Sequence, residues 1–205
     1  MGADNFPFPI PLKQNKGGQW FFDTAAGEDE ILARRIGRNE LAVIGVCGVL
    51  ADAQAEYFSH RHADGITNQY ALKFISDTGK QNGLYWEPAE GQPTSPLGPL
   101  AAFASDEGYS VKPTSHLPFH GYYFHMLTRQ GGHAPGGAKN YMINGKIVGG
   151  FAFVAYPAEY GNSGIMTFII NQGGGMLQKD LGPDTEKIAN AITEYDPDST
   201  WDRVE

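Results

Sequence analysis

Apolar residues between Glu28 and Ser59 recur with a helical period. Asp29 and Glu30 fall in the first turn of this segment, where acidic side chains suit the positive end of a helix. Its middle, LAVIGVCGVLA, is apolar on nearly every side, and polar residues then return on one side only. The pattern predicts a long helix with a break near Gly37, whose second half packs against a sheet.

The second half of the chain consists mainly of short apolar runs separated by Gly-rich turns. The runs cover residues 119–130, 146–157, 165–171 and 176–180, and their length and aromatic content indicate strands. The turn NQGGG, between the last two runs, is a strong hairpin signal because glycine adopts positive φ without strain. We therefore expect an antiparallel sheet.

Two shorter helices are expected beside this sheet. One covers residues 97–106, with Pro99 in its first turn, and the other covers residues 182–195, with Pro183 near its start. The predicted fold class is α+β: a long N-terminal helix packed on an antiparallel β-sheet, with a C-terminal helix.

The N-terminal segment FPFPIPL, residues 6–12, alternates apolar residues with proline. Proline has no N–H to donate, so the segment is expected to be extended or to lie at a sheet edge. The turn KQNKGG and the strand-like QWFFD follow it. We expect residues 1–27 to form a β-hairpin, the edge or remnant of an upstream region, and residues 28–205 to form one α+β domain.

Composition and charge narrow the possible partners and cofactors. The 205 residues carry a formal net charge of −8 without a cluster of Lys and Arg, so we expect no nucleic-acid partner. Cys47 is the single cysteine, lies in an apolar run and is expected to be a buried, inert thiol. The longest apolar run, residues 41–51, is too short to cross a bilayer, so we expect no transmembrane segment. No feature predicts a cofactor.

Ser163 lies in Gly-Asn-Ser-Gly, which differs by one residue from the Gly-Asp-Ser-Gly around the nucleophile of chymotrypsin-like proteases. Catalysis would need a base within hydrogen-bond reach, and His120 and His125 are the candidates. Neither histidine lies in a protease-like motif, and the expected strands are too few for a two-barrel protease. The alternative, a turn between two strands, is the favoured interpretation.

A metal site and an aromatic ligand surface are the other candidates. His60, His62 and Asp64 are close in sequence, but the chain has no His-Glu-x-x-His motif and no cysteine partner, so zinc is disfavoured.

Trp86, Tyr122 and Tyr160, with Asn162, could form a platform for a sugar or a peptide if they were exposed together. Aromatic residues more often serve as core or loop anchors.

Several long strings carry a specific resemblance to the bacterial family named domain of unknown function 2950. They are GRNELA, KFISDTGKQNGLYW, SPLGPL, HGYYFHMLTRQG, GGFAFVAYPAEYGNSGIMTFIINQ and KDLGPDT. The resemblance spans nearly the whole chain and implies an exported or lipoprotein-like protein, without a known activity, substrate or cofactor. Family members are more acidic in the loop at 60–69 and suggest calcium there, but HRHADGITNQ offers too few oxygen ligands.

The order of elements also resembles the globular part of pilin-like proteins, in which a long helix precedes an antiparallel sheet. Because the first residues do not resemble a signal peptide, we expect that this sequence lacks the export signal and any upstream domain. The favoured hypothesis is a non-enzymatic periplasmic or envelope module that binds a partner, peptide or glycan. Alternatives are a serine hydrolase using Ser163 and a structural subunit of a pilus- or secretion-related envelope assembly. The oligomeric state stays open.

Overall fold

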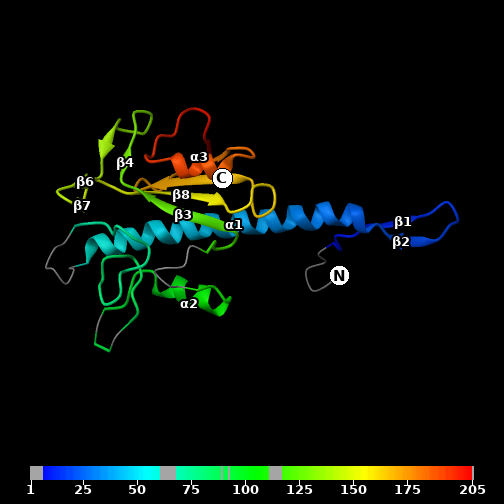
Figure 1. The fold of residues 1–205 in the computed structure, drawn as a ribbon, viewed down its shortest axis with the longest axis horizontal. Helices are drawn as coiled ribbons and strands as arrows, with labels where there is room; N and C mark the ends of the chain where they lie inside the picture. Colours follow the sequence, from blue (N-terminus) through cyan, green and yellow to red (C-terminus); the bar gives the residue numbers. More distant parts are fainter. Residues whose placement is uncertain (1–6, 61–67, 89, 92, 111–116, 205) are drawn as a thin grey trace.

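A computed structural model describes residues 7–60, 68–88, 90–91, 93–110 and 117–204 of the chain. A long helix, α1 (Thr24–Ser59), runs through most of the length of the molecule. Figure 1 shows a sheet and a C-terminal helix on one side of α1, and a second short helix on its other side. The predicted α+β class, with a long N-terminal helix, an antiparallel sheet and a C-terminal helix, is confirmed.

The main sheet has five antiparallel strands in the order β11-β10-β9-β8-β3. Their bounds are Tyr122–Leu127 (β3), Ala152–Pro157 (β8), Met166–Asn171 (β9), Met176–Asp180 (β10) and Asp202–Arg203 (β11). Every residue of β8 is buried, because the strand lies between two neighbours and between two layers of side chains. β3 forms one edge of this sheet.

The two faces of the sheet bury different side chains, as the alternation of a strand requires. Phe153 and Phe168 belong to the core under α1, together with Val43 and Leu50 of the helix. Val154 belongs to a second core, together with Ala152 and Tyr156, whose side chains lie on the same side of β8. The helix α3 (Thr185–Ala191) covers that second face.

Helix α1 is continuous through Gly37, so the predicted break is wrong. The helix also begins earlier than expected, at Thr24, where Asp23 caps it by accepting a hydrogen bond from the backbone N–H of Ala26 (3.2 Å). A glycine inside a helix lowers its stability by about 1 kcal/mol relative to alanine. Side chains of α1 on both sides of Gly37 bond to the sheet layer, and these bonds hold the helical conformation across it.

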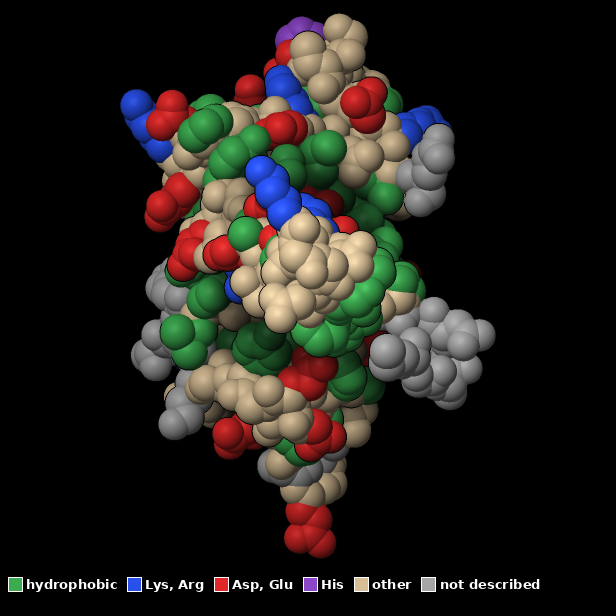
Figure 2. Space-filling view, turned by 90° about the vertical axis from the view of Figure 1, so that its right-hand side faces the viewer, with side chains coloured by type: hydrophobic (Ala, Val, Ile, Leu, Met, Phe, Trp, Pro, Cys, Tyr) green, Lys and Arg blue, Asp and Glu red, His purple; other side chains and the backbone are tan. Residues whose placement is uncertain are grey.

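The N-terminal hairpin and the first turns of α1 project beyond the sheet, and we call residues 7–31 the arm. The strands β1 (Leu12–Gln14) and β2 (Trp20–Phe22) pair antiparallel, which places Leu12 opposite Phe22. Figure 1 shows the hairpin at the far end of α1, and Figure 2, which looks along α1 onto it, shows apolar side chains gathered there. The expected domain boundary after residue 27 falls inside α1.

Smaller elements complete the fold. They are α2 (Gly98–Asp106), β4 (Arg129–Gln130) paired with β5 (Lys139–Asn140), and β6 (Met142–Ile143) paired with β7 (Lys146–Ile147). The predicted helix at 97–106 is therefore confirmed.

The run at 146–157 is interrupted between β7 and β8, because Gly149 packs against the backbone of Tyr141 and Gly150 has a φ of 140°. The C-terminal helix begins only at Thr185, two residues after Pro183.

Among the described residues, α1 is a helix long and apolar enough to cross a membrane by length and composition. Its most apolar 18-residue window has a mean hydropathy of 1.4, and 39% of that window is buried inside the protein. The core helix of a soluble protein and a signal sequence near the N-terminus pass the same test, so the expectation of no transmembrane segment stays a prediction.

Candidate functional site

Ser163 lies in a tight turn between β8 and β9 that is closed by its own backbone. The Ser163 hydroxyl accepts a hydrogen bond from the backbone N–H of Glu159 (3.0 Å) and donates one to the Glu159 carbonyl (3.2 Å). The N–H of Gly161, whose φ is 73°, donates to the carbonyl of Gly164 (2.8 Å). These bonds are those of a turn in which the serine fixes backbone geometry.

Three side chains of α1 anchor this turn, and we call them the clamp: Arg35, Asn39 and Glu40. Asn39 donates from Nδ2 to the Ser163 carbonyl (2.8 Å), and Arg35 donates to the carbonyl of Asn162 (3.2 Å) and to its side-chain oxygen. Glu40 accepts from the backbone N–H of Ile165, just before β9, and from that of Met166, the first residue of β9, at 2.8 and 3.0 Å. The clamp therefore ties the middle of α1 to the start of a core strand.

Two glycines allow the turn to pack this closely. A Cβ on Gly164 would collide with the hydroxyl and ring of Tyr122, and a Cβ on Gly121 would lie 2.8 Å from the Cβ of Ser163. Tyr122 is fully buried and donates to the carbonyl of Met166 (2.9 Å). Burial raises the pKa of Tyr122, and the Glu40 carboxylate adds to that effect.

The candidate histidines do not join Ser163 in a catalytic arrangement. His120 directly precedes Gly121, but its ring packs against those of Phe119 and Tyr109, and its Nε2 is 3.4 Å from Glu107. His125 lies on the α3 face of the sheet, where its Nε2 is 3.1 Å from the Ile192 carbonyl oxygen. Within the described residues, neither ring nitrogen hydrogen-bonds to the Ser163 hydroxyl.

Burial lowers the pKa of His125, and the hydrogen bond to the Ile192 carbonyl offsets this only in part. The fold therefore favours the neutral form of His125, which has Tyr156 beside it at a ring distance of 6.0 Å. A base with a lowered pKa contributes stability above its unfolded-state pKa of about 6.5 and loses that contribution as the pH falls.

We expect the thermal midpoint of the wild type to fall between pH 7 and pH 5, and His125→Phe to reduce this fall because it removes the buried proton-binding site. Thermal unfolding followed by circular dichroism at both pH values measures the difference. His133→Phe is the control. The pKa of His133 is raised by the Asp196 carboxylate, 2.9 Å from its Nδ1, so its loss should steepen the fall. Equal slopes for all three proteins would contradict the assignment.

The predicted aromatic platform is not assembled. The prediction that Tyr122 belongs to an exposed surface is wrong, because the residue is fully buried in the core, with Gly164 packed against its ring. Trp86 donates from its indole nitrogen to the Pro93 carbonyl (3.0 Å), and Tyr160 donates to Asp180 (3.2 Å). Asn162 is exposed but bonded to Arg35 and Glu159. These residues act as loop anchors.

For the metal candidates, the structure describes His60 alone, an exposed residue at the end of α1, while His62 and Asp64 lie outside the described residues. In the described part of the chain, no group of three or more His, Cys, Asp or Glu side chains is arranged to hold an ion. The Cys47 thiol is 1% exposed, and burial raises its pKa to about 12, so it is present as an unreactive thiol.

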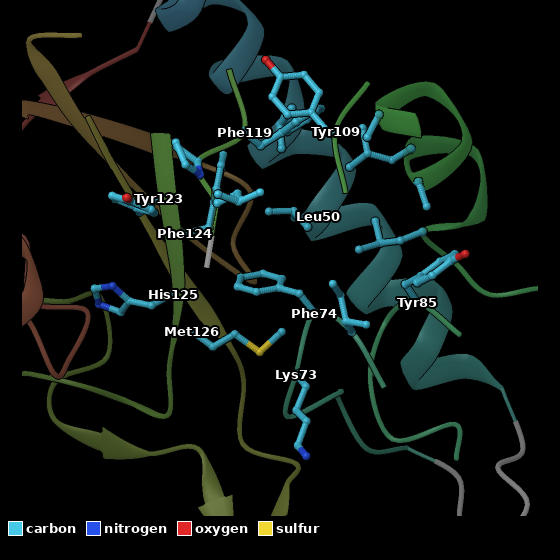
Figure 3. Close-up of a pocket in the computed structure, with 18 of the residues that line it drawn as sticks. Leu50, Lys73, Phe74, Tyr85, Tyr109, Phe119, Tyr123, Phe124, His125 and Met126 are labelled. Carbon is cyan, nitrogen blue, oxygen red and sulfur yellow. The ribbon is translucent and has the colours of Figure 1, made fainter. Parts of the chain in front are cut away.

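A cleft of about 620 Å³ opens between α1, α2 and the edge strand β3. Leu50 comes from α1, Ala101 from α2, Phe74 from the loop after α1, and Phe124 and Met126 from β3. Figure 3 shows that Phe124, Met126, Phe74 and Leu50 point toward one another in this cleft, while Tyr123 and His125 lie on the other side of the strand.

The cleft is mostly apolar and open to solvent. Leu72 and Leu117 at its margin are 44% and 66% exposed, and Lys73 is the charged side chain among its described lining residues. Such a surface can hold apolar side chains or an amphiphile. The sequence does not reveal the cleft, because its lining comes from segments that are far apart in the chain and share no motif.

The model of the family described as "Protein of unknown function (DUF2950)" matches residues 1–204 of this chain. The chain belongs to the DUF2950 family. Neither the curated proteins nor the solved structures include a match.

Three of the strings that carry the DUF2950 resemblance meet at the clamp. GRNELA supplies Asn39 and Glu40 from α1, HGYYFHM supplies Gly121 and Tyr122, and EYGNSGIM supplies the turn. The strings are far apart in sequence but form a single packed and hydrogen-bonded junction. The most recognisable sequence of this DUF2950 chain therefore includes residues that fix its fold.

Proposed function

We propose that the protein is a non-enzymatic binding module of the cell envelope, which holds an apolar segment of a partner in the cleft between α1, α2 and β3. The observation that carries the proposal is the cleft itself, which has a volume of about 620 Å³ and a mainly apolar lining, and lies open beside an edge strand. Concave clefts of about 300–1,000 Å³ with a mainly apolar lining are typical of ligand-binding sites.

A position outside the cytoplasm and a pilin-like arrangement are parts of the same proposal. The resemblance of the sequence to exported proteins supports the first, and the long helix that projects beyond its sheet supports the second. Fractionation of cells that express the full reading frame tests the position.

The hydrolase alternative has no comparable support. The Ser163 hydroxyl is engaged with the Glu159 backbone, and in the described part of the chain the candidate bases His120 and His125 contact other groups. A nucleophile needs a base within reach and an open position for the substrate.

We expect the apolar dye bis-ANS to bind the folded protein in the cleft, and Leu72→Glu to weaken this binding about tenfold. Leu72 is a partly exposed lining residue, so a carboxylate there places charge against the bound dye without disturbing the core. Fluorescence titration measures the affinity, and circular dichroism confirms that the variant is folded.

Leu41→Glu is the matched control, because Leu41 is 72% exposed on α1 but does not line the cleft. It should bind the dye like the wild type. If both variants weaken binding equally, the dye reports general surface hydrophobicity and the cleft is not the site.

A structural subunit of an envelope assembly is the second candidate function, and the arm is the observation that favours it. Trp20, Phe22 and Leu12 are 67%, 54% and 55% exposed, which is a large apolar surface for an isolated chain. An assembly would bury this surface against another subunit.

A further inference from the structure

The edge of β3 carries backbone groups that no strand uses. Tyr122 exchanges hydrogen bonds with Phe119, on the side away from β8. In an antiparallel ladder, both backbone groups of alternate residues point to the same edge, so those of Phe124 and Met126 also point away from β8. In the described part of the chain, no hydrogen bond from another segment reaches them.

Each end of this free edge is closed. At one end, the backbone N–H and C=O of Tyr122 are hydrogen-bonded to Phe119. At the other end, the N–H of Tyr141 donates to the carbonyl of Thr128 (2.9 Å). What remains open is a short stretch with two N–H and two C=O groups. These four groups can pair with the backbone of an extended segment of a few residues, and such pairing is what recognition by strand addition requires.

Hollows lie on both faces of this same stretch. Residues 123–126 line the apolar cleft on the α1 face and a second hollow of about 370 Å³ on the α3 face. Figure 3 shows Phe124 and Met126 turned into the cleft and Tyr123 and His125 turned to the opposite side. A strand added here would place its alternate side chains in the two hollows.

The geometry restricts the sequence of such a strand. Residues that hydrogen-bond in register with Phe124 and Met126 have their side chains on the same face of the sheet as these two, in the apolar cleft. The N–H and C=O groups of the residues between these positions point away from β3. The occupant must therefore be apolar, with a free N–H, at every second position, and proline is compatible only with the positions between.

The chain itself contains this pattern in residues 7–12. Phe8, Ile10 and Leu12 are apolar and keep their N–H groups, and each is preceded by a proline. Phe8 and Leu12 are 53% and 55% exposed, whereas Ile10 is half-buried against Gly27 of α1 and must leave this contact to enter a partner's cleft. The segment belongs to the arm, which Figure 1 shows at the end of α1 away from α2.

We propose that the free edge of β3 binds residues 7–12 of a second copy of this chain by strand addition, with Phe8 and Ile10 in the apolar cleft. The inference rests on the proposed function and names its partner. The arm of each copy projects away from its own cleft, so the contact links copies head to tail, with a heterologous interface.

The test is the affinity of the full chain for a fluorescein-labelled peptide of residues 6–12, measured by fluorescence anisotropy. The control peptide has the same side chains but carries N-methyl groups on the backbone nitrogens of Phe8 and Ile10, which removes the donors. We expect the control to bind at least tenfold more weakly, and Leu72→Glu to weaken binding of the unmodified peptide while Leu41→Glu does not. Equal binding of both peptides would overturn strand addition.

Sedimentation velocity of the full chain over a range of concentrations completes the test. The proposal expects association that rises with concentration and is reduced in Leu72→Glu. A monomer at every concentration would overturn the assignment of the second copy. If the cleft binds bis-ANS but not the peptide, only this inference fails, and if it binds neither, the proposed function fails with it.

Discussion

Gly164→Ala is expected to destabilise the protein by about 3 kcal/mol, because the added methyl group has no space. It would overlap the ring and hydroxyl of Tyr122, which is fully buried and bonded to the Met166 carbonyl. Either Tyr122 must leave its position in the core or the turn must lift from the clamp. Urea unfolding followed by fluorescence gives the change in the free energy of unfolding.

Gly175→Ala is the control for this prediction, because a Cβ at Gly175 meets no atom within 4 Å. It should change the free energy of unfolding by less than about 0.5 kcal/mol. A Gly164→Ala protein as stable as this control would show that the turn can move away from Tyr122, and that the clamp is not a rigid junction.

Gln54→Leu is expected to cost about 3 kcal/mol for a different reason. The Gln54 side chain is fully buried, and its amide donates to the Ala71 carbonyl (3.0 Å) and accepts from the Ala71 N–H (2.8 Å). Leucine has a similar size but cannot bond, so two buried backbone groups would lose their partners, each at a cost of about 1–3 kcal/mol.

Glu56→Leu is the control, because Glu56 is exposed and lies only two residues after Gln54 on the same helix. It should alter the free energy of unfolding by no more than about 0.5 kcal/mol. If Gln54→Leu behaved like Glu56→Leu, the segment around Ala71 would not depend on α1 for its backbone bonds. Hydrogen exchange of the Ala71 amide shows directly whether this backbone bond is lost, because the amide should become unprotected in Gln54→Leu.

The elements with a strong hydrophobic period were predictable from the sequence. The strands at 165–171 and 176–180 and the long helix to Ser59 lie where the pattern placed them. The break at Gly37 was wrong because a local propensity of about 1 kcal/mol cannot outweigh several tertiary hydrogen bonds. Those bonds come from a turn more than 100 residues later, which the helical pattern cannot reveal.

The candidate site shows the same division between local and distant information. The turn at Ser163 could be inferred from its glycines, since Gly161 has positive φ. Tyr122 could not be assigned to the core, because an aromatic residue in a strand can face either side and the register depends on the partner strand. The cleft requires the positions of α2 and of the loop after α1, which only the tertiary structure defines.

The clamp also has a mechanical consequence. Along α1, Arg35, Asn39 and Glu40 lie between the arm and the residues that form the core under the sheet. Tension applied to the arm reaches the sheet first through these three side chains, whose hydrogen bonds cross from the helix to the start of β9. The junction would carry such a load in shear, before any strand of the sheet is pulled from its neighbour.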